Sequence, residues 1–205
     1  TLCTVFAEQG ADVVQSHADL SAAGAAEEVI RNAGSFDVLV ANLSILAPST
    51  PSSDVGEEEW RSVFAALVDP LPRLTRAVLP IFASRGGGKI LVVGSASALR
   101  GMKRASSYSA ARGAQLAYVQ AVGVELAPQN IQVNAIAQNF VDNPTYFPAS
   151  VQANPRFQER LAREVPLGRL VSACEDALFA AYLCSDAANC FVGQVFPVSG
   201  GWATK

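Results

Sequence analysis

The chain has 205 residues, of which 50% are hydrophobic and 16% are charged, and its formal net charge is −3. This length and composition are typical of a compact domain with a sizeable core and exclude a disordered chain. The sequence has no basic patch that would attract nucleic acid, and no apolar run approaches the roughly 20 residues of a membrane span. Its single histidine, His17, excludes a histidine-based triad and a multi-histidine metal site, so we expect no bound metal.

The cysteines show neither the spacing of metal ligands nor a paired pattern. Free thiols are typical of a reducing compartment, and no signal peptide opens the chain. We therefore expect a cytoplasmic protein. The four residues are Cys3, Cys174, Cys184 and Cys190.

Helical and strand patterns alternate along the whole chain. Residues 1–10 have the pattern of the end of a helix capped by Gly10, and residues 11–14 have the pattern of a strand. Because the first strand of a parallel sheet normally lies in the middle of the sheet, we expect a further strand and a glycine-bearing turn to precede Thr1. Later strands are predicted at 36–42, 89–94, 131–136 and 192–198, and helices at 21–33, 57–85, 108–127, 152–164 and 174–184.

This order predicts an α/β protein with a Rossmann-like, doubly wound parallel sheet. We expect a single domain over residues 1–205 that is incomplete at its N-terminus. Pro70 and Pro72 should kink or split the helix predicted at 57–85. An aromatic and proline-rich loop, 137–151, follows the strand at 131–136.

One stretch, 94–112, concentrates polar groups that can perform catalysis. The apolar run 89–94 delivers Ser95 to the end of a buried strand, twelve residues separate Ser95 from Tyr108, and three separate Tyr108 from Arg112. If Tyr108 lies at the start of a helix, Arg112 lies one turn later on the same face. The unit then combines a hydrogen-bond donor, a base and a cation that favours the charged form of that base.

This order of elements, with Ser, Tyr and a basic residue at these places, resembles the short-chain dehydrogenase/reductase superfamily. The resemblance covers nearly the whole chain. It includes Asp19-Leu20, the strand into Asn42, the segment 165–169 and the closing glycines Gly200 and Gly201.

Three departures from that pattern carry more information than the matches. Arg112 stands where the motif has the Lys that also hydrogen-bonds the nicotinamide ribose, and Arg is not equivalent there. Residues 61–80 lack the Asn that these dehydrogenases place in the helix before the Ser strand. The strand 131–136 leads into 137–148 without the usual Pro-Gly turn that lies under the nicotinamide.

All three departures are similar to the halohydrin (haloalcohol) dehalogenases, whose signature is Ser, twelve residues, Tyr, three residues, Arg. The N-P-x-Y-F-P loop at 143–148 and the G-G-W-A-T segment at 200–204 also resemble that family. The resemblance implies a Rossmann-like fold without a nicotinamide cofactor. It also implies conversion of vicinal haloalcohols to epoxides with release of halide, and the reverse opening of epoxides by small anions such as azide, cyanide or nitrite.

The resemblance assigns roles to individual residues. Tyr108 is the base, Arg112 lowers its pKa, and Ser95 donates to the substrate oxygen. The leaving halide needs a dry nest of backbone N–H groups at the carboxyl end of the strand, which places it at Asn139, Phe140 and Val141. The complete predicted halide and substrate site comprises Gln138, Asn139, Phe140, Val141, Tyr146 and Phe147, with the aromatic residues as apolar walls.

Alternatives remain at this stage. An NAD(P)-dependent short-chain dehydrogenase/reductase with an atypical Arg is the main one, and a catalytically inactive scaffold of the same fold is another. Ser97 is a rival to Ser95, and the three aromatic side chains of the loop can equally be core residues.

Three further expectations concern packing. Asp19 is expected to cap the helix predicted at 21–33, and Trp202 is expected at a subunit interface rather than in the active site. The superfamily resemblance implies a homotetramer, and the small residues along the helix 108–127 would permit close packing between subunits. The predicted partners are therefore further copies of the chain and small molecules, namely a haloalcohol or epoxide and halide, with neither nucleic acid nor membrane.

Overall fold

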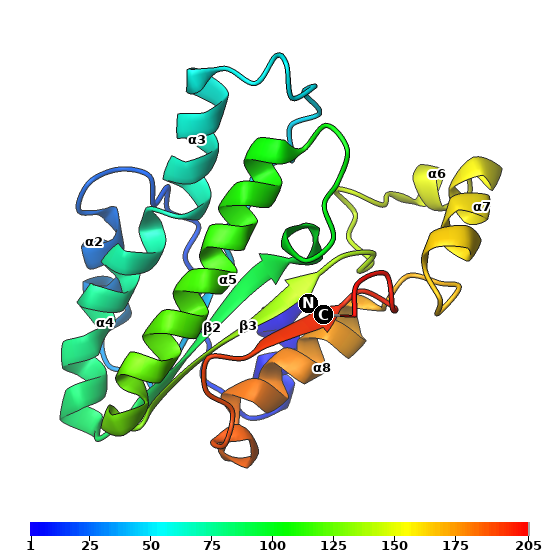
Figure 1. The fold of residues 1–205 in the computed structure, drawn as a ribbon. Coiled ribbons are helices and arrows are strands. Elements are labelled where there is room, and N and C mark those ends of the chain that lie inside the picture. The colour runs from blue at the N-terminus through cyan, green and yellow to red at the C-terminus, as the bar shows by residue number, and fades with distance from the viewer. Residues whose placement is uncertain (205) are drawn as a thin grey trace.

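The computed structural model describes residues 1–204 and shows an α/β fold built on one parallel sheet (Figure 1). All neighbouring strands are parallel, and they follow one another across the sheet in chain order. The prediction of a Rossmann-like parallel sheet is confirmed. The strands are β1 (Val38–Ala41), β2 (Gly88–Ser95), β3 (Ile131–Gln138) and β4 (Val195–Val198).

The centre of the sheet is formed by β2 and β3, which are buried along almost their whole lengths. Alternate residues of β2 serve two cores, because successive side chains of a strand point to opposite faces. Ile90 and Val92 join the cluster that contains residues of α5 (Ser106–Leu126), whereas Leu91 and Val93 pack with residues of α8 (Ala173–Cys184). A strand buried on both faces is nearly continuously apolar, as the sequence of β2 is.

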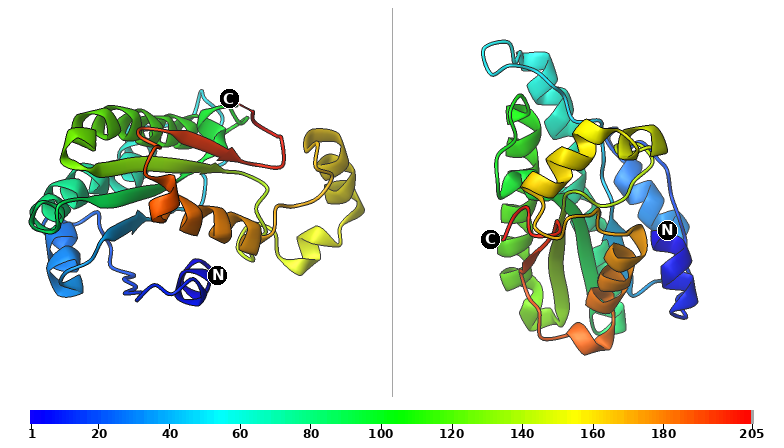
Figure 2. Two further views of the ribbon diagram at one scale, coloured as in Figure 1. Left: turned by 90° about the horizontal axis from the view of Figure 1, so that it is seen from below. Right: turned by 90° about the vertical axis from the view of Figure 1, so that its right-hand side faces the viewer.

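Helices cover both faces of the sheet (Figure 2). On one face lie α4 (Pro70–Arg85) and α5, and α3 (Glu57–Leu67) packs against both of them. On the same side, α2 (Ala25–Ala33) packs against α4. On the other face lies α8, with α1 (Leu2–Glu8) against it. Beyond the carboxyl ends of the strands project α6 (Ala149–Gln152) and α7 (Pro155–Glu164), and short 3₁₀ turns occupy η1 (Ala96–Ala98), η2 (Ala127–Gln129) and η3 (Asp186–Ala188).

Prolines begin two of the helices. The helix predicted at 57–85 is split as expected, and Pro70 is the first residue of its second half. The helix predicted at 152–164 is confirmed as α7, which begins three residues later than predicted, at Pro155, whereas α6 lies at the end of the segment predicted as a loop. Asn154 caps α7 by accepting a hydrogen bond from the Arg156 N–H at 2.9 Å, and a proline is well suited to the first helical position.

The strand predicted at 11–14 is wrong. Residues 11–19 have no regular structure, and Val13 and Val14 are 41% and 73% exposed. A strand needs a neighbour to satisfy its backbone hydrogen bonds, and within residues 1–204 no strand lies beside this segment.

Asp19 does not cap a helix, contrary to the prediction. The helix begins at Ala25, after Gly24 in a left-handed conformation, and not at residue 21. The Asp19 carboxylate instead accepts a hydrogen bond from the Ser21 N–H at 2.9 Å, which closes a local turn.

No helix within residues 1–204 combines the length and the apolar character needed to span a membrane.

Candidate active site

The predicted site residues gather at the carboxyl edge of the sheet, where β2, β3 and β4 end. Ser95 is the last residue of β2 and lies beside Gln138 of β3 in the strand register. The Ser95 side chain caps η1 by accepting a hydrogen bond from the Ser97 N–H at 3.2 Å, and the two hydroxyl oxygens are 3.0 Å apart. Ser97 is 1% exposed and Ser95 is 8% exposed, so exposure does not distinguish between the two serines as the substrate contact.

Tyr108 and Arg112 share one face of α5, as their spacing predicts. Tyr108 is the third residue of the helix, and both side chains are buried. The guanidinium carbon of Arg112 lies 5.0 Å from the centre of the Tyr108 ring. The guanidinium thus covers the face of the phenol ring in a cation–π contact.

Arg112 is fixed from the inner side of the helix. Its Nη1 donates to the Val93 carbonyl at 3.1 Å and to the Gln115 side-chain oxygen at 2.9 Å. The bond to Val93, two residues before Ser95, ties the start of α5 to the end of β2. Within residues 1–204, the buried Nε atom of Arg112 has no acceptor.

The loop after β3 holds Phe140 in an unusual backbone conformation. Its φ angle is +52°, in the left-handed region that bulky side chains rarely adopt, and its side chain is 2% exposed. Such strain costs on the order of 1–3 kcal/mol and is concentrated at functional sites. The Phe140 N–H donates to the Asn139 side-chain oxygen at 2.9 Å.

Val141 lies next to this strained position, in a bridge with Val171. The bridge uses the carbonyl of Phe140 and the N–H of Asp142, which flank Val141. Because backbone groups alternate in direction along an extended segment, the Val141 N–H points away from Val171. The prediction of Asn139 as a member of the nest is wrong, because its N–H donates to the Val198 carbonyl at 3.0 Å. Of the other two N–H groups, that of Phe140 is paired with the Asn139 side chain and that of Val141 is directed away from the bridge.

Aromatic packing decides which of the loop side chains are core residues. Phe140 stacks on Phe147, with ring centres 5.9 Å apart, and lies 6.1 Å from the Trp202 ring. Trp202 is 7% exposed within the chain, so the expectation of a subunit-interface residue is wrong. It is buried instead, because Arg100 holds its carbonyl and covers its ring from 4.9 Å.

Tyr146 lies in a different environment from the other two aromatic residues. Its side chain is 42% exposed, and its hydroxyl donates to the Ile45 carbonyl at 2.9 Å, which links the loop after β3 to the loop after β1. Partial burial raises the pKa of Tyr146, the neighbouring Tyr108 raises it further, and Arg112 opposes the shift.

Gln138 makes a contact that the sequence did not indicate. Its side-chain amide donates to one carboxylate oxygen of Asp176, on α8, at 2.5 Å. Asp176 is 4% exposed, and within residues 1–204 its other oxygen has no donor. Burial raises the pKa of Asp176 to about 6, although the bond from Gln138 opposes this shift.

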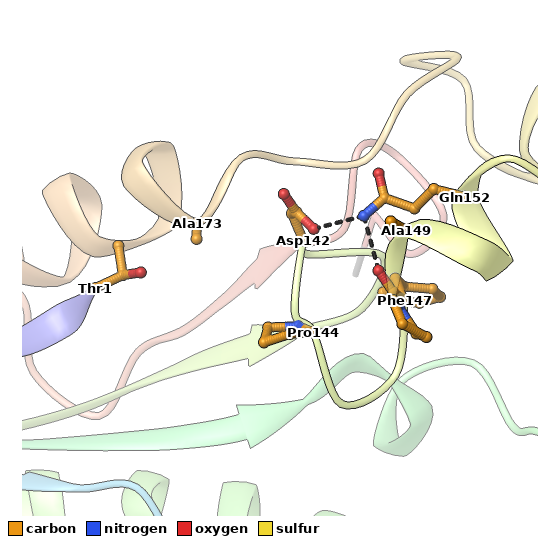
Figure 3. A pocket seen from close by; sticks show the side chains of 8 residues that line it. Thr1, Asp142, Pro144, Phe147, Ala149, Gln152 and Ala173 are labelled. Carbon is orange, nitrogen blue, oxygen red and sulfur yellow. Dashed lines mark hydrogen bonds between the residues drawn. The ribbon is translucent and has the colours of Figure 1, made fainter.

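A cavity of about 290 Å³ is lined mainly by the loop after β3 (Figure 3). Gln152 spans it with bonds to an Asp142 carboxylate oxygen at 2.9 Å and to the Phe147 carbonyl at 2.7 Å. Of the predicted site residues only Phe147 lines the cavity, so it is not the space in front of Tyr108. Its lining is Thr1, Asp142, Pro144, Phe147, Pro148, Ala149, Gln152 and Ala173.

Gln115 and Asp176 are the residues of this region that reasoning from the sequence missed. The available signal for Gln115 was its position three residues after Arg112, on the same helix face. No local signal marks Asp176, because its partner lies 38 residues earlier in the chain.

Comparisons with known proteins place these features in a family. Residues 3–203 match the family model described as enoyl-(acyl carrier protein) reductase. The chain is 34% identical to cis-4-hydroxycyclohexanecarboxylate dehydrogenase from Sinomonas cyclohexanicum over 171 residues, which are 82% of this chain and 66% of that protein. The chain thus spans about two thirds or less of the length of such curated relatives.

Solved structures give a second comparison. A structure named "Dehalogenation enzyme" is 32% identical, with a TM-score of 0.83 over 98% of this chain and 82% of that one. L-sorbose reductase from Gluconobacter frateurii, complexed with NADPH and L-sorbose, shares the fold with a TM-score of 0.87, covering 100% of this chain and 82% of its own, at 23% identity. The match over almost the whole chain shows that this protein belongs to the enoyl-(acyl carrier protein) reductase family, within the short-chain dehydrogenase/reductase superfamily.

Proposed function

We propose that this protein converts vicinal haloalcohols to epoxides, with release of halide and a proton and without a nicotinamide cofactor. The observation that carries the proposal is the buried pair of Tyr108 and Arg112, in which the guanidinium carbon lies 5.0 Å from the phenol ring centre. Arg112 cannot lose its proton, so a positive charge lies beside the phenol over the whole working pH range.

The proposed step balances in atoms and charge. Tyr108, as phenolate, takes the hydroxyl proton of the substrate while the substrate oxygen forms a bond to the neighbouring carbon. The carbon–halogen bond breaks and the halide leaves with its electron pair. Ser95 donates a hydrogen bond to the substrate oxygen, and because attack is intramolecular, orientation contributes much of the rate.

The backbone geometry of the loop after β3 supports halide binding at this loop. Phe140 and Val141 present successive backbone N–H groups at a left-handed turn, a geometry that forms anion-binding nests. Phe147 and Trp202 pack around Phe140 and restrict water, which strengthens any hydrogen bond to an anion. The Asn139 side chain that now accepts from the Phe140 N–H would have to turn away when halide binds.

The residues present do not match the needs of a nicotinamide ribose. Arg112 is 5% exposed, and its Nη1 donates both of its bonds inward, to Val93 and Gln115. Gln138 and Asn139 stand where the superfamily pattern has its Pro-Gly turn. The 32% identity to the structure named "Dehalogenation enzyme" also favours a dehalogenation reaction.

A second candidate is NAD(P)-dependent oxidation of an alcohol or reduction of a carbonyl. The family match favours it, as do the relatives named dehydrogenases and reductases, which are the more numerous. It requires that the nucleotide bind without the ribose contact that Lys supplies in the superfamily.

One experiment separates the two candidates. The purified protein is given a simple vicinal bromoalcohol, and bromide release is followed, while NADH, NADPH and sodium bromide are titrated by calorimetry. We expect bromide release that Tyr108→Phe abolishes, and no useful affinity for either dinucleotide. Absence of bromide release, together with micromolar-range NADPH binding and ketone reduction, would establish the reductase instead.

A further inference from the structure

Gln115 is a fully buried polar side chain that joins Arg112 to a different helix. Its side-chain oxygen accepts from Arg112 Nη1 at 2.9 Å, and its Nε2 donates to the Leu67 carbonyl at 2.6 Å. The side chain is 0% exposed. A buried amide is costly unless both its oxygen and its nitrogen are hydrogen-bonded. The positions of the Arg112 guanidinium, the Gln115 amide and the Leu67 carbonyl therefore depend on one another.

The Leu67 carbonyl is available because the chain breaks there between α3 and α4. In a continuous helix this carbonyl would accept from the N–H of residue 71. The Leu71 N–H instead donates to the Val68 carbonyl at 3.0 Å, and Pro70 has no N–H to offer. The break therefore leaves a fixed acceptor facing α5, and Gln115 fills it.

We propose that Gln115 is a positioning residue that holds the Arg112 guanidinium over the Tyr108 ring. Arg112 is held by only two acceptors, since its Nε has none within residues 1–204. One of these is the Val93 carbonyl, and the other is Gln115, whose own orientation is set by Leu67. Without Gln115 the guanidinium keeps one bond and can rotate away from the phenol.

The hydrogen bond between Gln115 and Arg112 is suited to positioning the guanidinium and not to proton transfer. Neither a side-chain amide nor a guanidinium gives up a proton at ordinary pH. Gln115 is also neutral, so it fixes Arg112 without cancelling the positive charge that acts on Tyr108. A carboxylate at this place would fix the cation but would oppose its field.

A purely structural role for Gln115, as a tie between α3 and α5, predicts a different result. Loss of a structural tie lowers the melting temperature and leaves the pH dependence of the reaction unchanged. Loss of a positioning residue also moves the pH at which the Tyr108 phenolate forms. The two roles are therefore separated by a pH profile and not by stability.

The test compares Gln115→Met, which is apolar and similar in length, with Gln120→Met, an exposed position on the same helix. The proposal rests on the roles that the proposed function gives to Tyr108 and Arg112. We expect Gln115→Met to lower kcat for bromide release at neutral pH about tenfold, with KM within about twofold, and to move the acidic limb of the kcat profile upward by about half to one pH unit. Gln120→Met should match the parent.

A readout without turnover keeps this test separate from that of the proposed function. The near-ultraviolet phenolate absorbance that disappears in Tyr108→Phe is titrated in each variant, and its midpoint should rise in Gln115→Met by the same amount. If the parent releases no bromide, the proposed function fails and the phenolate midpoint alone decides the role of Gln115. A folded Gln115→Met with the midpoint of the parent would overturn the positioning role.

Gln115→Glu covers the case in which Gln115→Met does not fold. The two side chains have the same shape, and the carboxylate keeps an acceptor for Arg112. Because the new charge opposes the field of the guanidinium, we expect the phenolate midpoint to rise here too. An unchanged midpoint in Gln115→Glu would mean that Gln115 does not act on Tyr108 through Arg112.

Discussion

Replacing Asp176 by Asn should destabilise this protein in acid, and this loss of stability should be offset as the pH rises to neutral. Asp176 is 4% exposed, one of its oxygens accepts from Gln138, and the other has no donor within residues 1–204. Burial raises the pKa of this carboxyl from 3.8 to about 6. The folded protein therefore holds the proton more tightly than the unfolded chain does.

The sign and size of the effect follow from that difference. Well below pH 3.8, the ordinary pKa of Asp, Asp176 is protonated in both states, and its contribution to stability is fully present; it is lost as the pH rises through about 6. A shift of about two pH units corresponds to about 3 kcal/mol in the free energy of unfolding. Asn cannot ionise, so Asp176→Asn removes this pH-dependent loss, although its amide leaves a buried donor that costs about 1–3 kcal/mol at every pH.

The measurement is the free energy of unfolding of both proteins in urea at several pH values between about 4 and 8, at one protein concentration. The difference between variant and parent should change by about 3 kcal/mol in favour of the variant across this range. Asp12→Asn, at an exposed position, is the matched control and should show no such trend. Parallel stability curves for parent and Asp176→Asn would refute the reasoning and mean that Asp176 is solvated in solution.

Three further predictions test other parts of the molecule. Tyr108→Phe should lower bromide release at least about a hundredfold with the fold intact, because general bases contribute factors of this size, and activity within tenfold of the parent would remove Tyr108 from the mechanism. The chain should be a homotetramer in light scattering, packed through the small residues of α5, and a mass near the 21.4 kDa of one chain at micromolar concentration would contradict this. Ser172→Ala should cost about 1 kcal/mol of stability, since Ser172 and Glu175 form a capping box on α8; Ser84→Ala, at an exposed hydroxyl, is the control, and equal losses would contradict the capping role.

The central strands and the α3/α4 break were predictable because their causes are local. An apolar run such as 89–94 forms a buried strand almost anywhere in a parallel sheet, and Pro70 ends a helix by its own geometry. Residues 11–14 lacked such a local cause. Their β-branched pattern fits a strand, but pairing depends on a neighbour, and none lies beside them within residues 1–204.

The site residues also differ in whether their arrangement has a local cause in the sequence. Ser95, Tyr108 and Arg112 lie within one loop-and-helix unit, so their spacing alone predicts how a helix presents two of them on one face. The contacts of Gln115 with Leu67 and of Asp176 with Gln138 were not predictable, because the partners lie 48 and 38 residues apart and are set by how helices pack on the sheet. Trp202 was misplaced for the same reason, since only the packed structure brings it against Phe140.

Gln115 and the Leu67 carbonyl belong to no motif, but the proposed chemistry depends on them. A phenol becomes an effective base only if a cation is kept in place beside it, and a buried guanidinium on a long side chain has several rotamers available. The carbonyl freed at the α3/α4 break, 48 residues from Gln115, selects one of them through the Gln115 amide. Under the proposed mechanism, the reactivity of Tyr108 depends on a break in a helix that carries none of the predicted catalytic residues. Gln115, rather than a further residue of the motif, is therefore the position to mutate next.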